Sequence, residues 1–217
     1  MTDEPQTPTS GLLEVGDADA ARVRRAAFTR LLATAAPVPA AMLATEVGLT
    51  EGQVEAELSR LAASGAISRD DSGAVVAAGG LSVTPARHQL LLDGHEYWTW
   101  CAFDGIGIPA ALELDAVVDT RCPTCGGGLR ITITGGNPPS DSPVVGWLPG
   151  GPCINVQADF CPDAKLFCTD AHLATWRQTT GDPPGTAAPP GELAETGRQV
   201  WADLARLPRQ PDASVGN

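Results

Sequence analysis

A thiol and a carboxylate lie three residues apart in the apolar, aromatic stretch YWTWCAFDGIGIPA, where they are Cys101 and Asp104. A buried carboxylate is unfavourable unless it is paired or protonated. A second thiol, Cys161, follows in the segment DFCPD. Two thiolates bind a soft metal ion strongly, and a carboxyl group with a raised pKa can supply a proton. Together the three residues suit the breaking of a bond between carbon and a thiophilic metal.

Aromatic side chains flank these three residues in the sequence. Trp100 and Phe103 stand beside the first thiol and the acid, and Phe160 precedes the second thiol. Such surroundings predict a site partly closed to water, where the pKa of the acid is raised and a proton stays available. We expect these three aromatic residues to line the substrate pocket, with Trp98 and Phe167 close by.

A second motif, CPTCGG, holds Cys122 and Cys125 as a Cys-x2-Cys knuckle. Its glycines let backbone amides approach the sulfurs, and one knuckle supplies half of a tetrahedral zinc site. Cys161 and Cys168 are the closest substitute for a second knuckle, so the four cysteines could together hold one Zn²⁺. The knuckle could equally be a turn with two incidental thiols. We interpret His172, in the segment DAHLATW, as the cap of a helix rather than a ligand.

The net charge of the chain limits the kinds of partner that it can bind. Its 217 residues carry 26 acidic and 14 basic side chains, a formal net charge of −12, which repels the phosphate backbone of nucleic acids. A hydrophobic content of 43% and a mean hydropathy of −0.02 are typical of a globular protein. We therefore expect a small neutral or cationic substrate, and we do not expect nucleic acid as a partner.

The sequence also predicts the cellular compartment of the protein. No apolar run approaches the roughly 20 residues that span a bilayer, and MTDEPQTPTS has neither the basic start nor the apolar core of a signal peptide. We therefore expect a cytoplasmic protein without membrane contact. In a reducing compartment the six cysteines are expected to bind metal, to react or to pack, and not to form disulfides.

Residues 19–80 are predicted to form a winged-helix-like domain, after a flexible polar tail at residues 1–18. Apolar residues at helical spacing indicate three helices, and short β-branched runs around an acidic turn indicate a hairpin. The helices are predicted over residues 20–36, 42–47 and 51–64, and the hairpin over residues 66–83.

The third predicted helix decides how this domain is interpreted. Thr50 and Gln53 match a capping box at its start, and Val54, Leu58 and Leu61 share one face. A winged helix is typical of modules that read DNA. This helix, however, carries three glutamates and one arginine, a poor match to phosphate. We therefore expect the domain to serve packing.

Residues 81–217 are predicted to form a catalytic α+β core with a mixed or antiparallel sheet. We interpret residues 88–112 as a mixture of helix and loop and residues 181–191 as a linker. An amphipathic helix at residues 192–207 should pack back onto the core through Leu193, Val200, Trp201 and Leu204. Strands are predicted at residues 112–122, 129–135, 144–149 and 153–161.

The order of these motifs resembles that of the organomercurial lyases, also called alkylmercury lyases. The shared features are WCAFD followed by IPA, then RC at Cys122, then FC at Cys161, and a C-terminal amphipathic helix. The resemblance implies that Cys101 attacks or holds mercury first and that Cys161 is the second mercury ligand. Asp104 would take a proton from a cysteine and deliver it to carbon. The products would be a hydrocarbon and Hg(II) on the two sulfurs.

The resemblance also implies the surroundings of the reaction. Trp100 would line the site, and Cys122 would be structural. No cofactor would be required, an external thiol would release the bound Hg(II), and a mercuric reductase could receive the ion. Two departures from the family pattern stand out: Cys125 turns a lone structural cysteine into a knuckle that could hold zinc or a second metal ion, and Pro162 follows Cys161.

Two alternatives to an organomercurial lyase remain open from the sequence. The chain could be a winged-helix metal sensor or a zinc-ribbon adaptor, in which Cys161 would be a zinc ligand together with Cys122, Cys125 and Cys168. It could also be a lyase homologue that acts on another organometal or transfers metal. The first alternative competes directly with the lyase for Cys161.

Overall fold

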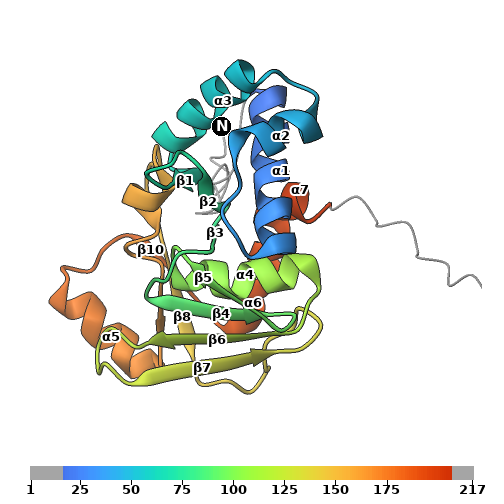
Figure 1. The fold of residues 1–217 in the computed structure, drawn as a ribbon. Helices are drawn as coiled ribbons and strands as arrows, with labels where there is room; N and C mark the ends of the chain where they lie inside the picture. Colours follow the sequence, from blue (N-terminus) through green and yellow to red (C-terminus); the bar gives the residue numbers. More distant parts are fainter. Residues whose placement is uncertain (1–16, 207–217) are drawn as a thin grey trace, which may run out of the picture.

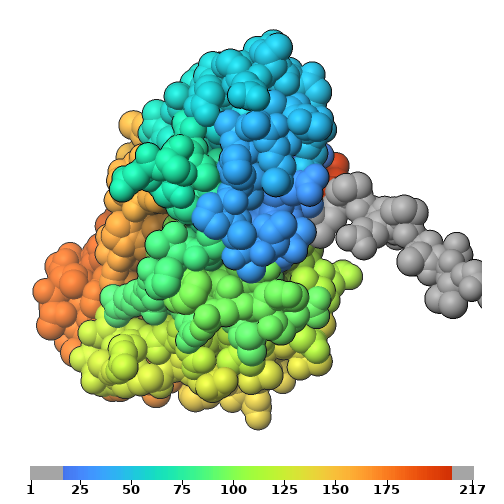
Figure 2. Space-filling view, viewed as in Figure 1, coloured from blue at the N-terminus to red at the C-terminus, as the bar shows by residue number. Residues whose placement is uncertain are grey.

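The computed structural model describes residues 17–206, which form an α+β fold of helices packed on antiparallel sheets (Figure 1). The N-terminal helices and the sheet-rich part pack directly against each other in the space-filling view (Figure 2). Most of the predicted tail, residues 1–16, lies outside the described residues. The N-terminal part comprises α1 (Ala18–Thr34), α2 (Ala40–Val47), α3 (Glu51–Ala63), β1 (Ile67–Arg69), β2 (Val75–Ala78) and β3 (Leu81–Ser82).

Two of the three N-terminal helices begin at a capping side chain, Asp17 for α1 and Thr50 for α3, whereas Pro39 before α2 makes no such hydrogen bond. The predicted capping box of α3 is confirmed: Thr50 and Gln53 satisfy each other's backbone N–H groups. The predicted apolar face of α3, Val54, Leu58 and Leu61, is buried. The predicted hairpin is also present, because β1 and β2 pair antiparallel.

One antiparallel sheet of seven strands, in the order β1-β2-β3-β5-β4-β6-β7, joins the N-terminal part to the rest of the chain. The short strand β3 makes this junction by pairing with β2 on one side and β5 on the other. The sheet therefore fixes the N-terminal part relative to the core. The core strands are β4 (His88–Leu92), β5 (His95–Thr99), β6 (Ala116–Arg121) and β7 (Gly128–Ile133).

The interpretation of residues 88–112 as helix and loop is wrong for their first half, which forms the β4–β5 hairpin. Asp93 and Gly94 make its turn with φ angles of 48° and 80°. Two positive φ angles are the signature of a type I′ turn, which favours the dipeptide Asp-Gly. This turn places the end of β5 directly before helix α4 (Ala102–Leu112).

Helix α4 lies across the sheet and packs closely on the C-terminal helix α6 (Pro190–Val200). The two backbones meet at Gly107 and Gly197, where a Cβ on Gly197 would lie 2.3 Å from the Cα of Gly107. The predicted packing of the C-terminal helix is confirmed, because Leu193, Trp201 and Leu204 are buried and Val200 packs partly buried against the core. The last helix of the described chain is α7 (Ala202–Ala205).

A second sheet of three strands has the order β10-β8-β9. The linker predicted at residues 181–191 is wrong, since its middle is the edge strand β10 (Gly185–Ala188), paired with β8 (Val145–Pro149). The strand predicted at residues 153–161 is also wrong. There the Asn155 side chain accepts a hydrogen bond from Ala158 N and starts the π-helix η1 (Val156–Phe160). The remaining elements are β9 (Lys165–Phe167) and α5 (Asp170–Thr179).

Within residues 17–206, no helix combines the length and the apolar character needed to cross a bilayer.

Candidate active site

The structure brings together the two thiols and the carboxylate singled out in the sequence. One ligand atom each from Cys101, Asp104 and Cys161 lies within 4.8 Å of the other two, and all three residues are buried. Cys101 is the N-cap of α4 and Asp104 lies in its first turn. Cys161 directly follows η1, so it reaches the other two from a separate part of the chain.

Helix capping ties Cys101 and Asp104 to each other. The backbone N–H of Cys101 donates a hydrogen bond of 2.8 Å to Asp104 Oδ2. Just before it, Thr99 Oγ1 donates a bond of 2.8 Å to the Cys101 carbonyl. The backbone on both sides of the first thiol is therefore fixed by buried polar contacts.

Burial controls the protonation of this pair. It raises the pKa of Asp104 to about 7, against the opposing effect of hydrogen bonds from the Cys101 and Trp100 backbone and from the Cys101 thiol. Burial also raises the pKa of Cys101 well above its ordinary range, reinforced by the hydrogen bond with Cys161 and by the negative charge of Asp104. Near neutral pH the thiol thus keeps its proton while the carboxyl group can gain or lose one.

Gly80 allows the close approach of Asp104 to the sheet. Its φ angle is 91°, and a Cβ at this position would lie 2.7 Å from Asp104 Cγ. The carbonyl of Gly80 also accepts a hydrogen bond of 3.2 Å from Trp100 N. A residue of the N-terminal part of the chain therefore forms one wall of the acid's surroundings.

The second thiol is positioned by contacts between η1 and the N-terminal part. Gln157 Nε2 donates to the carbonyls of Gly65 at 2.8 Å and Ile67 at 3.2 Å. Cys161 N donates to Val156 O at 2.9 Å and so continues the helical turn. The N-terminal part thus holds the segment that carries Cys161.

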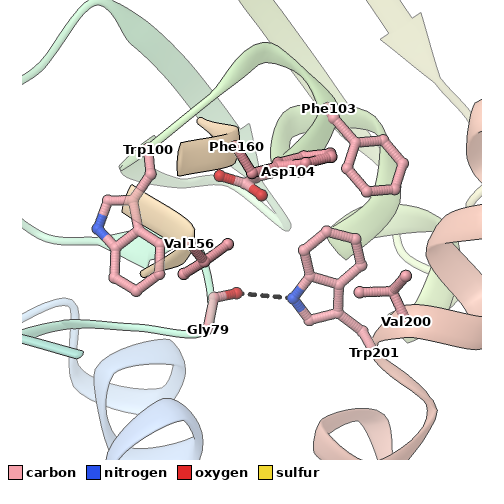
Figure 3. A pocket seen from close by; sticks show the side chains of 9 residues that line it. Gly79, Trp100, Phe103, Asp104, Val156, Phe160, Val200 and Trp201 are labelled. Carbon is pink, nitrogen blue, oxygen red and sulfur yellow. Dashed lines mark hydrogen bonds between the residues drawn. The ribbon is translucent and has the colours of Figure 1, made fainter. Parts of the chain in front are cut away.

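An apolar pocket lies beside Asp104 (Figure 3). Phe103 packs in it against Phe160, with ring centroids 6.2 Å apart, and against Trp201, at 5.2 Å. Trp201 Nε1 donates a hydrogen bond of 2.6 Å to Gly79 O. The cavity volume is about 10 Å³, roughly the room of one water molecule.

A wider groove with a cavity volume of about 390 Å³ reaches the second thiol from the surface. Its lining includes Cys161, Trp100, Arg87 and His88. Trp100 also lines the apolar pocket, so this residue is shared by the groove and the surroundings of Asp104.

The three aromatic residues predicted to line the pocket, Trp100, Phe103 and Phe160, all do so. Phe167, expected nearby, instead packs against Trp176 with centroids 5.4 Å apart. Trp98 lines a different surface groove. Sequence reasoning missed part of the pocket, although the amphipathic pattern of the C-terminal helix had marked two of these residues as buried. The missed residues are Gly79, Gly80, Val156, Val200 and Trp201.

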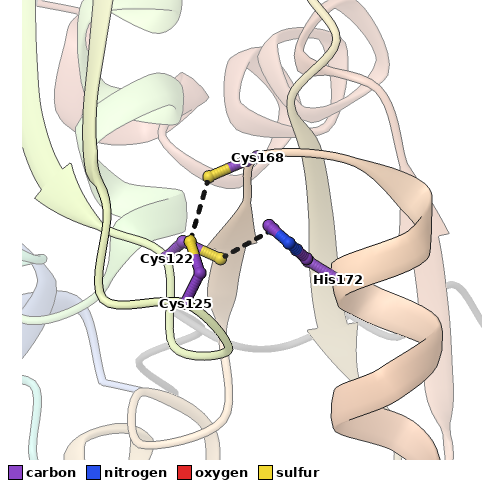
Figure 4. Close-up of side chains that lie close together, drawn as sticks. All are labelled: Cys122, Cys125, Cys168 and His172. Carbon is purple, nitrogen blue, oxygen red and sulfur yellow. Dashed lines mark hydrogen bonds between the residues drawn. The ribbon is translucent and has the colours of Figure 1, made fainter.

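A second cluster of chemical groups lies apart from this site (Figure 4). It joins Cys122, Cys125, Cys168 and His172, with one ligand atom of each within 4.8 Å of the others. The predicted set that shared Cys161 is therefore wrong, because that thiol belongs to the first cluster.

The interpretation of His172 as only a helix cap is also wrong. Thr169 caps α5, and His172 Nδ1 lies 3.7 Å from Cys122 Sγ. The sequence signal for this contact was the short separation of Cys168 and His172, which stand four residues apart at the start of α5.

The thiols of this second cluster differ in acidity. Burial raises the pKa of Cys122, but hydrogen bonds from backbone N–H groups of Cys125, Cys168 and Thr124 outweigh it and lower the pKa to about 6. Burial together with the neighbouring thiols raises the pKa of Cys168 to about 11. One sulfur of the cluster is thus surrounded by donors that stabilise a thiolate.

Comparisons with known proteins agree with the motif order. A family model described as alkylmercury lyase matches residues 81–202. The alkylmercury lyase of Staphylococcus epidermidis is 26% identical over 176 residues, which is 80% of this chain and 79% of that protein. The alkylmercury lyase of Streptomyces lividans is 28% identical over 179 residues, covering 81% and 80%.

A solved structure shares the fold. The crystal structure of the mercury-bound form of MerB2 superposes with a TM-score of 0.81 at 21% identity, covering 90% of this chain and 96% of that chain. The similarity thus extends beyond the matched core and includes most of the N-terminal part.

Proposed function

The chain belongs to the alkylmercury lyase family, and on that premise we propose that it cleaves the carbon–mercury bond of organomercurials by protonolysis. The products are a hydrocarbon and Hg(II), and the role is organomercurial detoxification. The observation that carries this proposal is the meeting of two buried thiols with a carboxyl group whose pKa is raised to about 7. Sulfur binds mercury, and the carboxyl group moves a proton at a pH where both its forms are populated.

In the first step, Cys101 Sγ bonds to the mercury of R–Hg–X and the thiol proton passes to Asp104. The proton has a short path, because the ligand atoms of the two residues lie within 4.8 Å of each other. The raised pKa of Cys101 keeps its proton in place until mercury arrives. Cys161 Sγ then becomes the second ligand, its proton leaving with X⁻ as HX.

In the second step, Asp104 delivers its proton to the carbon bound to mercury. The electron pair of the carbon–mercury bond goes to the new carbon–hydrogen bond, and the two thiolates hold the Hg²⁺ that remains. The balance is R–Hg–X plus two thiols giving R–H, HX and a mercury dithiolate. Electron donation from two sulfurs weakens the bond that breaks, and the carboxylate is ready to repeat the cycle.

The surroundings suit the organic group of such a substrate. Trp100, Phe103 and Phe160 form an apolar wall beside Asp104, so the group R packs there while mercury faces the sulfurs. Because the cavity volume is only about 10 Å³, entry of R requires side chains to move aside. Excluding water from the carbon favours transfer of the proton from Asp104.

Product release needs a further thiol. The Hg²⁺ on two buried sulfurs is bound too strongly to leave unaided, and an external thiol exchanges it away through the groove at Cys161. A mercuric reductase is the proposed recipient. No cofactor takes part in this scheme.

We also propose that residues 19–80 act as a winged-helix-like domain that supports the catalytic core of residues 81–217. In favour of this, Val38 bridges to Val75 beside the β1–β2 hairpin. The hydrogen bonds of Gln157 to this part support a positioning role for Cys161.

The decisive experiment incubates the protein with phenylmercury and excess thiol and measures benzene in the headspace. We expect benzene from the unaltered protein and none from Cys101→Ala or Cys161→Ala. Cys153→Ser, which removes an exposed thiol outside both clusters, is the control and should keep activity. Benzene release by a double Cys101→Ala, Cys161→Ala variant would end the proposal.

Asp104→Asn separates binding from proton transfer. The amide can still accept the hydrogen bond from Cys101 N, but it carries no proton for the carbon. We expect this variant to retain phenylmercury, measured as bound mercury per chain, while benzene release is lost. Loss of mercury binding together with turnover would assign Asp104 a role in binding instead.

A further inference from the structure

We propose that Cys122, Cys125, Cys168 and His172 form a four-ligand zinc site that fastens the segment carrying Cys161 to the main sheet. Three thiols and one imidazole are a donor set typical of structural zinc. Four protein ligands complete a tetrahedron, so this zinc would have no open position for substrate.

Two separations within the cluster match a tetrahedral ion. Zinc–sulfur bonds of about 2.3 Å in a tetrahedron place two sulfurs roughly 3.8 Å apart, and a sulfur and a nitrogen roughly 3.6 Å apart. Cys125 Sγ lies 3.7 Å from Cys168 Sγ, and Cys122 Sγ lies 3.7 Å from His172 Nδ1. The side chains of Figure 4 converge on one common point. A disulfide bond of about 2.05 Å is far shorter than the observed sulfur separation.

The backbone of the knuckle also suits thiolates. Gly127 N lies 3.4 Å from Cys125 Sγ as a hydrogen-bond donor, and Gly126 takes a φ angle of 70° in the turn that presents it. Amide donors to sulfur are the outer contacts that orient metal ligands. On the other side, Thr124 Oγ1 donates to His172 O at 2.8 Å and holds α5 against the knuckle.

The site joins two parts of the core. Cys122 and Cys125 lie in the turn between β6 and β7 of the large sheet, whereas Cys168 and His172 lie between β9 and the first turn of α5. Cys168 follows Cys161 by seven residues. The chain just before Cys161 is already held by the hydrogen bond of Gln157 in η1 to the N-terminal part. Zinc would hold the chain just after Cys161.

Metal analysis of the full-length protein, purified under reducing conditions without added metal, tests the proposal directly. We expect about one zinc per chain. Zinc should fall to background in Cys125→Ser and His172→Ala, and it should stay in the matched controls Cys153→Ser and His95→Ala. Both control residues are exposed and lie outside the two clusters.

Two further measurements keep the test independent of whether a variant folds. Replacing zinc by Co²⁺ in the unaltered protein should give the intense visible bands of tetrahedral, thiolate-bound cobalt. A strong chelator should lower the Tm. Zinc-free protein that yields no such cobalt spectrum would overturn the proposal, as would a disulfide between Cys125 and Cys168 in the protein purified under reducing conditions.

Cys161→Ser separates this proposal from the lyase reaction. This variant should lose benzene release and keep its zinc. If zinc leaves with Cys161, the assignment of four ligands is wrong, whatever the activity. If zinc stays but the unaltered protein releases no benzene, the zinc site stands and the lyase proposal fails.

Discussion

The backbone N–H of Cys101 donates a hydrogen bond of 2.8 Å to Asp104 Oδ2, at the buried N-terminus of α4. One contact thus serves both the start of the helix and the pairing of the reactive thiol with the acid. The carboxyl group cannot turn away without leaving the N-cap N–H unpaired in the core, a loss of about 1–3 kcal/mol. The geometry of the pair is therefore protected by the stability of the helix.

The raised pKa of Asp104 predicts that stability falls as pH rises. The pKa is 3.8 for the unfolded chain and about 7 in the fold, so between these values the folded state binds more protons. Stability then decreases with pH across this window. Because one pKa unit corresponds to about 1.4 kcal/mol, the full cost above pH 7 is on the order of 4 kcal/mol. Asp104→Asn should remove this dependence, as measured by denaturant unfolding at a series of pH values.

A matched control uses an acid in the exposed β1–β2 turn. Asp71→Asn removes a carboxylate of that turn and should leave the pH dependence as it is. If Asp104→Asn and the unaltered protein show the same slope of unfolding free energy between about pH 4 and 7, Asp104 is not held in a protonated form.

The pair of Cys101 and Asp104 also predicts a pH profile for turnover. The pair must share one proton when mercury binds, because that proton ends on carbon. Below the pKa of about 7 the pair holds two protons, and the second has no easy exit from a buried site. We expect kcat/KM for phenylmercury to rise with pH through about 7, with the slope of one titrating group. A profile that falls across this range would show that the reactive form begins with both protons.

Gly80→Ala should disturb the acid directly. The φ angle of 91° is strained for alanine, and the new Cβ would lie 2.7 Å from Asp104 Cγ. We expect a loss of stability of about 1–3 kcal/mol and a drop in benzene release beyond what that loss explains. Gly94→Ala is the matched control, since its φ angle is 80° and no atom lies within 4 Å of its added Cβ. Equal activity losses in both variants would mean that backbone strain alone is responsible.

Local signals in the sequence predicted the N-terminal helices well, because caps and apolar spacing act within a few residues. The Thr50 capping box and the apolar face of α3 could be predicted from residues within one helix, without knowing which distant elements pack on that face. The β4–β5 hairpin was missed although Asp93-Gly94 carried its turn signal, because short apolar runs do not by themselves distinguish a strand from a helix. Residues 153–161 look like a strand in composition, yet the side chain of Asn155 starts a helical turn there.

The spacing of the cysteines along the sequence does not determine which of them meet in the fold. Nothing in the 59 residues between Cys101 and Cys161 fixes their distance, so the expectation that they meet came from the chemistry that two thiols and an acid suit and from the resemblance to the lyases. The partners of the Cys122 knuckle were sought in a second pair of thiols, Cys161 and Cys168, although their spacing is looser than that of a knuckle, and His172 was interpreted as a helix cap. Only the path of the chain through β9 and α5 decides between them.

Trp201 offers a final test of how the pocket supports Asp104. Its Nε1 donates a buried hydrogen bond of 2.6 Å to Gly79 O, next to the glycine that packs on the acid. Trp201→Phe keeps an aromatic ring against Phe103 but leaves that carbonyl unpaired, at a cost of about 1–3 kcal/mol. We expect a lower Tm and a lower kcat for benzene release, because Gly80 is no longer held against Asp104.

Trp147 supplies the comparison for this variant. It is also a buried tryptophan, but within the described residues its Nε1 has no hydrogen-bond partner. Trp147→Phe therefore removes ring area without orphaning a carbonyl, and it lies outside the residues that line the pocket. It should lower the Tm while kcat measured well below that Tm is kept. A kcat that falls equally in both variants would trace the effect to general loosening of the core, and the contact between Trp201 and Gly79 would have no separate role in positioning the acid.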